Sequence, residues 1–220
     1  LPPMTQEDLE FERFQIKAVS AIEEELDRIL KTRKQSRIQT IADMVIRNYG
    51  HLDEKINFYQ NLRSLEDYVS RHSLNVAILC AMITHVMNIR REEQYHTVCA
   101  ALLHDMGKLK KHEDVYFGAP YSREDAIRNC ETQEEAYSVI EDAFATEGPA
   151  IRRICQQAAG KQLDLFPEEG KESRYKMLEG SNVLLVANRY DEITAMTLQG
   201  TAQSEVKAAQ ELLEHPEVYD

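Results

Sequence analysis

Long segments with helical spacing, separated by scarce glycine and proline, constrain the fold of this chain more than any other feature. Eight glycines and six prolines occur among 220 residues, and they cluster between segments in which apolar residues recur every three or four positions. That spacing matches the repeat of an α-helix. No stretch alternates apolar and polar residues for long enough to indicate a strand, so the sequence predicts an all-α fold.

The spacing also gives the approximate extent of each helix. Residues 69–87 are apolar on nearly every side, which is typical of a buried central helix. Another helix is expected to begin at Ser122, since Asp125 three residues later completes an approximate capping box. Residues 160–172 are predicted to form one long irregular loop. The remaining helices are expected over residues 6–34, 38–49, 52–65, 93–104, 132–144, 149–159, 175–196 and 204–214.

The charge of the chain limits its partners. Lysine and arginine number 26 against 38 acidic residues, which gives a formal net charge of −12. Nucleic acids and membrane surfaces are anionic, so neither is expected as a general partner. The longest apolar stretch, residues 76–87, is too short to cross a bilayer. Any phosphate must therefore be met by a metal ion or by a local basic pocket.

The cysteines indicate a reducing compartment. They lie far apart with no C-x-x-C pair, and three fall in apolar helical stretches. Buried, reduced thiols in a cytoplasmic protein are expected rather than disulfides. The four positions are Cys80, Cys99, Cys130 and Cys155.

The length predicts one domain, with or without a helical extension. The chain begins Leu1-Pro2-Pro3 rather than with methionine, so we expect a further domain upstream.

One histidine stands out from the rest. His104 ends an apolar helix and is followed directly by Asp105, then by Gly107 and Lys108. An imidazole and a carboxylate at one helix end can reach the same divalent ion, with Mn, Fe, Zn and Mg as candidates. Lys108 would supply a point charge for a phosphate oxygen. His72, at the polar start of the buried helix, is either a third ligand or a hydrogen-bonded core histidine.

These residues lie in segments that resemble a known family. Residues 68–79 and the run CAALLHDMGK, from Cys99 to Lys108, resemble the HD superfamily of metal-dependent phosphohydrolases. Within it they are similar to the HD-GYP branch, whose members are bacterial cyclic di-GMP phosphodiesterases. Residues 182–194 resemble the final helix of that branch. The resemblance implies an HD-domain helical bundle over residues 66–220. Residues 1–65 would form an N-terminal helical extension, either a dimerisation or signal-input element or a cover for the core.

Carried over residue by residue, the resemblance gives a reduced site. It implies His72, His104 and Asp105 as metal ligands, and Asp105 and Lys108 as catalytic residues. The metal-binding aspartate of the final helix falls on Asn188, and a second aspartate falls on Asp191, so either could be the fourth donor.

Several family positions have changed in this chain. The next family histidine falls on Thr132, and the His-His-Glu motif falls on Gln157, Ala158 and Ala159. The Gly-Tyr-Pro motif falls on Leu165, Phe166 and Pro167, and the later arginines and tyrosine are replaced near Thr197, Gln199 and Gly200. The remaining donors could hold at most one metal, and an asparagine carbonyl binds it more weakly than a carboxylate.

Two hypotheses remain open at this point. The first is a one-metal phosphohydrolase that acts on a small phosphate ester or nucleotide and is not expected to hydrolyse cyclic di-GMP efficiently. The second is a catalytically inactive HD-GYP-like module that binds a signalling partner or a nucleotide, because a fold alone does not establish activity. An upstream signalling domain and a homodimer through the N-terminal helices are the partners expected in either case.

Overall fold

The computed structural model describes residues 3, 5–35, 37–52, 64, 66–110, 122–168, 176–195 and 204–219. All regular structure within these ranges is helical, which confirms the all-α prediction. The elements are α1 (Gln6–Thr32), α2 (Ile38–Tyr49), α3 (Tyr68–Val86), α4 (Arg91–Leu103), η1 (Met106–Leu109), α5 (Arg123–Tyr137), α6 (Ile140–Phe144), η2 (Ala145–Glu147), α7 (Gly148–Lys161), η3 (Gln162–Leu165), α8 (Glu179–Thr194) and α9 (Glu205–Glu214).

Local signals set the ends of several helices. Thr5 caps α1 through a reciprocal pair of hydrogen bonds with Asp8: the Asp8 N–H donates to the Thr5 hydroxyl, and the Thr5 N–H donates to the Asp8 carboxylate. Arg33 ends the helix in the left-handed conformation, with φ 58°. The predicted cap at Ser122 is confirmed, since its side chain accepts from the Asp125 N–H at 3.2 Å.

Several predicted bounds were wrong. Thr132 lies inside α5, which runs from the Ser122 cap to Tyr137, and α6 begins only at Ile140. The predicted loop over 160–172 begins too early, because α7 continues to Lys161 and η3 follows without a gap. Helix α8 begins at Glu179 instead of residue 175. Most of the predicted helix at 52–65 falls outside the described residues.

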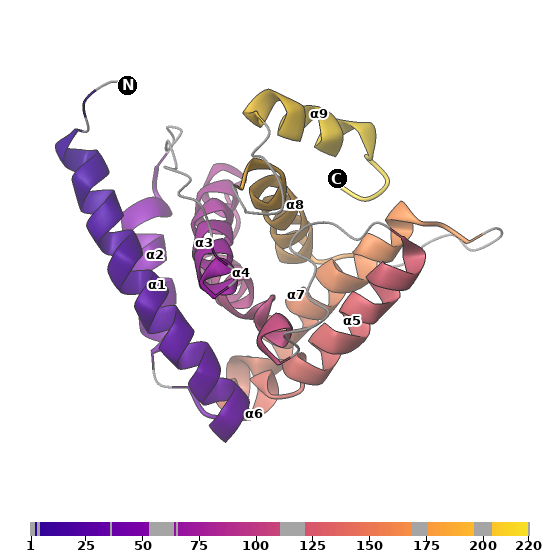
Figure 1. Ribbon diagram of the computed structural model, residues 1–220, viewed down its shortest axis with the longest axis horizontal. Coiled ribbons are helices and arrows are strands. Elements are labelled where there is room, and N and C mark those ends of the chain that lie inside the picture. The colour runs from indigo at the N-terminus through magenta and orange to yellow at the C-terminus, as the bar shows by residue number, and fades with distance from the viewer. Residues whose placement is uncertain are drawn as a thin grey trace.

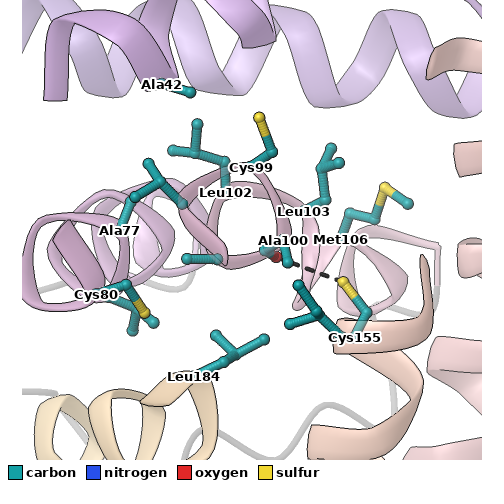
Figure 2. Packing of buried hydrophobic residues seen from close by; sticks show 14 of the residues in the cluster. Ala42, Ala77, Cys80, Cys99, Ala100, Leu102, Leu103, Met106, Cys155 and Leu184 are labelled. Carbon is teal, nitrogen blue, oxygen red and sulfur yellow. Dashed lines mark hydrogen bonds between the residues drawn. The ribbon is translucent and has the colours of Figure 1, made fainter. Parts of the chain in front are cut away.

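Helix α3 occupies the centre of the bundle, as its apolar composition predicted. It packs against α1, α2, α4 and α8, while α5 and α7 lie together on the side opposite α1 (Figure 1). Side chains from α3, α4, α7 and α8 meet in one core (Figure 2). The cysteines are free, as predicted, and the Cys155 thiol donates to the carbonyl of Ala100.

The two N-terminal helices belong to the same core. Ile22, Leu26 and Ile29 of α1 and Val45 of α2 are fully buried, and α2 packs on both α3 and α4. Helices α1 and α2 therefore cover the central helices α3 and α4. The division between residues 1–65 and 66–220 remains a prediction.

Over the ranges that the structure describes, no helix combines the length and the hydropathy that crossing a bilayer would require.

Candidate metal centre

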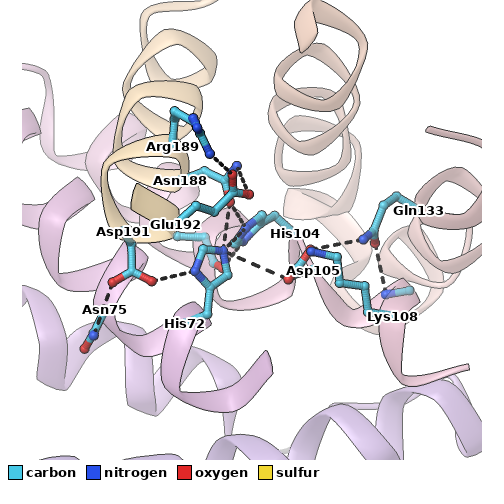
Figure 3. A network of polar contacts seen from close by, with 12 residues as sticks. His72, Asn75, His104, Asp105, Lys108, Gln133, Asn188, Arg189, Asp191 and Glu192 are labelled. Atoms are coloured by element: carbon cyan, nitrogen blue, oxygen red, sulfur yellow. Dashed lines mark hydrogen bonds and ion pairs between the residues drawn. The ribbon is translucent and has the colours of Figure 1, made fainter. Parts of the chain in front are cut away.

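Helix α3, the junction between α4 and η1, and the distant helix α8 bring the predicted site residues together. His72 lies in the first turns of α3, His104 ends α4, Asp105 precedes η1, and Asn188 and Asp191 lie on α8 (Figure 3). Helix α8 packs against both α3 and α4. Its residues three apart share one face, so Asn188 and Asp191 both point toward the histidines.

His72 lies at the middle of this arrangement and has no exposed surface. Its Nδ1 atom lies 2.6 Å from Oδ2 of Asp191, and its Nε2 atom lies 2.8 Å from Oδ1 of Asn188. The ring stacks on Tyr68 with centroids 5.3 Å apart. Since an ionised carboxylate can only accept a hydrogen bond, Nδ1 carries a proton. In the neutral ring Nε2 then holds a lone pair that faces Asn188.

His104, like His72, has its Nδ1 atom beside an acceptor and its Nε2 atom facing Asn188. Nδ1 lies 2.6 Å from the carbonyl oxygen of Ala101, an acceptor, so Nδ1 is the donor. Nε2 lies 2.9 Å from Oδ1 of Asn188 and 3.2 Å from Nε2 of His72. Tyr137 donates its hydroxyl proton to the backbone carbonyl of His104 and so fixes the end of α4.

Asp105 contributes an oxygen without a hydrogen-bond partner. Its Oδ1 atom accepts from the amide of Gln133 and lies 3.1 Å from the ammonium of Lys108. Its Oδ2 atom is buried, makes no hydrogen bond, and lies 4.0 Å from Nε2 of His72. A buried acceptor left unpaired costs about 1–3 kcal/mol.

These atoms form a set of donors suited to a cation. Two Nε2 lone pairs, Oδ1 of Asn188 and Oδ2 of Asp105 converge with no proton between them when both rings are neutral. Ligand atoms of His72, His104 and Asp105 all lie within 4.8 Å of one another. Imidazole nitrogens and carboxylate oxygens are ordinary ligands of divalent metals. The residues present therefore fit a single divalent ion.

The local electrostatics agree with this donor set at His104 and Asp105, while at His72 they favour the protonated ring, so a bound cation would displace a proton from Nε2. Burial lowers the pKa of His104 below its ordinary value, which keeps that ring neutral. Burial would raise the pKa of Asp105, but Lys108 and the two histidines outweigh it, so this pKa is lowered and the carboxylate stays ionised. Burial also lowers the pKa of His72, while Asp191 and Asp105 raise it to a higher net value.

Asp191 and Lys108 lie beside the centre. Asp191 contacts Nδ1 of His72, the nitrogen on the side of the ring away from Asn188, and its other oxygen accepts from the amide of Asn75 at 3.3 Å. Of the two alternatives for a fourth donor, the geometry favours Asn188. Lys108 is buried, pairs with Asp105, and lies 5.9 Å from the centre of the Tyr68 ring.

Two positions at which the HD-GYP resemblance would place further ligands make contacts within the fold. Oε1 of Gln157 accepts from the N–H of Leu178 and from the hydroxyl of Ser181, which ties α7 to the start of α8. Ala158 is part of the core. Thr197, Gln199 and Gly200 lie outside the described residues.

Sequence reasoning missed three residues of this network. Gln133 holds Asp105 with its amide and accepts from the N–H of Gly107 at 3.0 Å. Asn75 of α3 donates to Asp191 of α8. Glu192, one turn after Asn188 on α8, accepts from the Asn188 amide. Their positions one turn from His72 and Asn188 were the only signal in the sequence.

Comparison with known proteins identifies the family. The family model described as HD domain matches residues 69–196, a span that contains every predicted site residue. A search of curated proteins and a search of solved structures each found no match. Since the family match covers more than half of the sequence, and its span contains the histidines and the aspartate described above, this chain belongs to the HD domain family.

Proposed function

We propose that this protein is a metal-dependent phosphohydrolase with a single divalent cation at the centre formed by His72, His104 and Asp105. The observation that carries the proposal is the convergence of two imidazole lone pairs and a buried, unpartnered carboxylate oxygen. Membership of the HD domain family, which suggests a metal-dependent phosphohydrolase, supports the same activity.

The donor set also limits the metal. His72, His104 and Asp105 would hold the ion, with the amide oxygen of Asn188 as fourth donor. Two nitrogens and two oxygens favour Mn²⁺, Fe²⁺ or Zn²⁺ over Mg²⁺, which prefers oxygen ligands. When bound, the cation supplies Lewis-acid polarisation of a phosphoryl oxygen and lowers the pKa of a water molecule.

The chain's own residues prepare the site. Asp191 holds a proton on Nδ1 of His72 and thereby aims Nε2 at the centre. Lys108 balances the charge of Asp105, and the same ammonium is the cation that we propose to meet a phosphate oxygen. With a net charge of −12 on the chain, this local positive charge matters for an anionic substrate.

We propose a small phosphate ester or a nucleotide as substrate, and do not expect efficient hydrolysis of cyclic di-GMP. The HD-GYP resemblance would place further ligands at Thr132, Gln157 and Ala158, and two of these side chains cannot supply them here. The amide of Gln157 is engaged with α8, and Ala158 has no donor atom.

A second candidate follows from that same observation. Gln157 holds α7 to the start of α8 at a position where the HD-GYP resemblance would place a metal ligand, which favours a fold kept without the chemistry of that branch. The chain would then be an inactive HD-GYP-like module that binds a partner or nucleotide. An upstream signalling domain, homodimerisation through α1 and α2, and a cytoplasmic location accompany either candidate as proposals.

Metal content separates the two candidates. Protein produced with Mn and Fe supplied should contain about one equivalent of metal, and a His104→Ala, Asp105→Ala double variant should contain none. The matched control is His215→Ala, Asp142→Ala, which removes an exposed histidine and an exposed aspartate that bind other partners.

A phosphatase and phosphodiesterase screen on the metal-loaded protein then tests catalysis. If the protein contains no metal under any condition, the proposal of a metal-dependent hydrolase is overturned. Titration calorimetry with cyclic di-GMP would show whether the second candidate binds that nucleotide.

A further inference from the structure

The amide of Asn188 can bind a cation in only one of its two orientations. Its Oδ1 atom faces the two histidines, and its Nδ2 atom donates to Oε1 of Glu192 at 3.0 Å. The two ends of an amide are nearly equal in size, so neighbouring hydrogen bonds decide which end faces which way.

A rotated amide would remove the cation site. It would place an NH₂ group where Oδ1 now lies, 2.8 and 2.9 Å from the Nε2 atoms of His72 and His104. Two N–H bonds could then satisfy the two ring lone pairs. The site would be complete without a cation, and a metal would have to displace those bonds.

Glu192 opposes this rotation. In the rotated state Oδ1 of Asn188 would face the Glu192 carboxylate, so two acceptors would meet without a proton. Glu192 is itself held: only 6% of its side chain is exposed, and its Oε2 accepts from Arg189 at 3.1 Å. Arg189 is fixed in turn by Glu211 of α9, to which its Nε donates at 2.8 Å.

We infer that Glu192 is a positioning residue that keeps the carbonyl of Asn188 turned toward the metal centre. Its hydrogen bond is with Asn188, and its charge also acts on His72. This inference rests on the proposed function, because it assumes that a cation binds between the histidines.

The first test is the Mn²⁺ affinity of Glu192→Ala, measured by calorimetry. Partners of metal ligands typically contribute about 10–100-fold in affinity, and a loss of that size is expected. Glu192→Gln should lie between this variant and the parent, since glutamine can offer either a carbonyl or an NH₂ group to Asn188. It also keeps the shape of the side chain if the alanine variant folds poorly.

A second test separates positioning from simple loss of negative charge. Asn188→Asp replaces the amide with two equivalent oxygens, so orientation no longer matters. Removing Glu192 in that background should cost much less affinity than in the parent. An equal loss in both backgrounds would mean that Glu192 acts only through its charge, and would overturn the inference.

Glu93→Ala is the matched control, since Glu93 forms a similar three-residue-spaced pair with Arg90 away from the centre. It should leave Mn²⁺ affinity unchanged. No binding of Mn²⁺ by the parent protein would overturn the proposed function and this inference together. Binding by the parent with unchanged affinity in both Glu192 variants would overturn this inference alone.

Discussion

Asp191 and His72 are 119 residues apart in the sequence, yet the carboxylate Oδ2 lies 2.6 Å from the ring Nδ1. Both side chains are buried. This contact fixes which ring nitrogen carries the proton, and so it determines that Nε2 of His72 faces the centre. A carboxylate behind a ligating histidine is a common way to orient the ring and to increase its basicity.

Asp191→Asn should therefore lower Mn²⁺ affinity by roughly tenfold while the protein stays folded. An asparagine oxygen can still accept the Nδ1 proton, but the charge that strengthens the bond is lost. Calorimetric titration measures the change, with Asp27→Asn on the exposed face of α1 as control. Equal affinities for the two variants would show that Asp191 does not support the site.

Gln133 is predicted to affect both the site and the stability of the fold. Gln133→Ala removes the donor to Asp105 and leaves the N–H of Gly107 without its acceptor. We expect a loss of about 1–3 kcal/mol in the free energy of unfolding, and an affinity for Mn²⁺ roughly tenfold lower.

Denaturant unfolding and metal titration of the same Gln133→Ala preparation check the two effects. Gln156→Ala is the control, because that amide binds Glu134 away from the centre. If the stability falls while the affinity stays at the parent value, Gln133 supports the loop but not the ligand.

The sequence could predict what depends on neighbours in the chain. Helix α2 was predicted with its observed bounds because its apolar spacing is regular, and Ser122 was predicted as a cap because its partner Asp125 lies three residues away. The break between α5 and α6 was missed, since no glycine or proline marks Ser138 and Val139.

The centre required information that the sequence does not carry. His104 and Asp105 are adjacent, so the motif alone indicated them. The choice between Asn188 and Asp191 depends on how α8 is rotated about its own axis against α3, which is a property of the packed bundle. Gln133 reaches Asp105 across 28 positions, and nothing near it in the sequence indicates that contact.

Two glycines on neighbouring helices are predicted to respond in opposite ways to alanine. A Cβ atom on Gly180 would overlap the hydroxyl oxygen of Thr97, at the close contact between α8 and α4, whereas one on Gly160 would meet nothing within 4 Å. Gly180→Ala should destabilise the protein by about 1–3 kcal/mol. Gly160→Ala should be neutral or stabilise it by up to about 1 kcal/mol.

Denaturant midpoints measure both glycine variants. Adding Thr97→Ala to Gly180→Ala removes the obstructing oxygen and should recover part of the loss. If the double variant loses as much unfolding free energy as the two single variants together, the strain does not arise from the contact between Gly180 and Thr97.

Two adjacent glutamates on α1 offer a test of how the N-terminal helices are held to each other. Glu25 is fully buried, accepts from the backbone N–H of Arg37 at the start of α2 at 2.8 Å, and lies 3.9 Å from Nε of the same arginine. The exposed Glu24 pairs with the Arg37 side chain at 2.6 Å. Glu25→Ala should cost about 1–3 kcal/mol of unfolding free energy, because a backbone donor loses its partner. Glu24→Ala should cost less than about 1 kcal/mol, as exposed ion pairs do. Urea unfolding of the two variants decides the point: equal losses would mean that the charge on the Arg37 side chain, and not the buried hydrogen bond, holds α1 to α2.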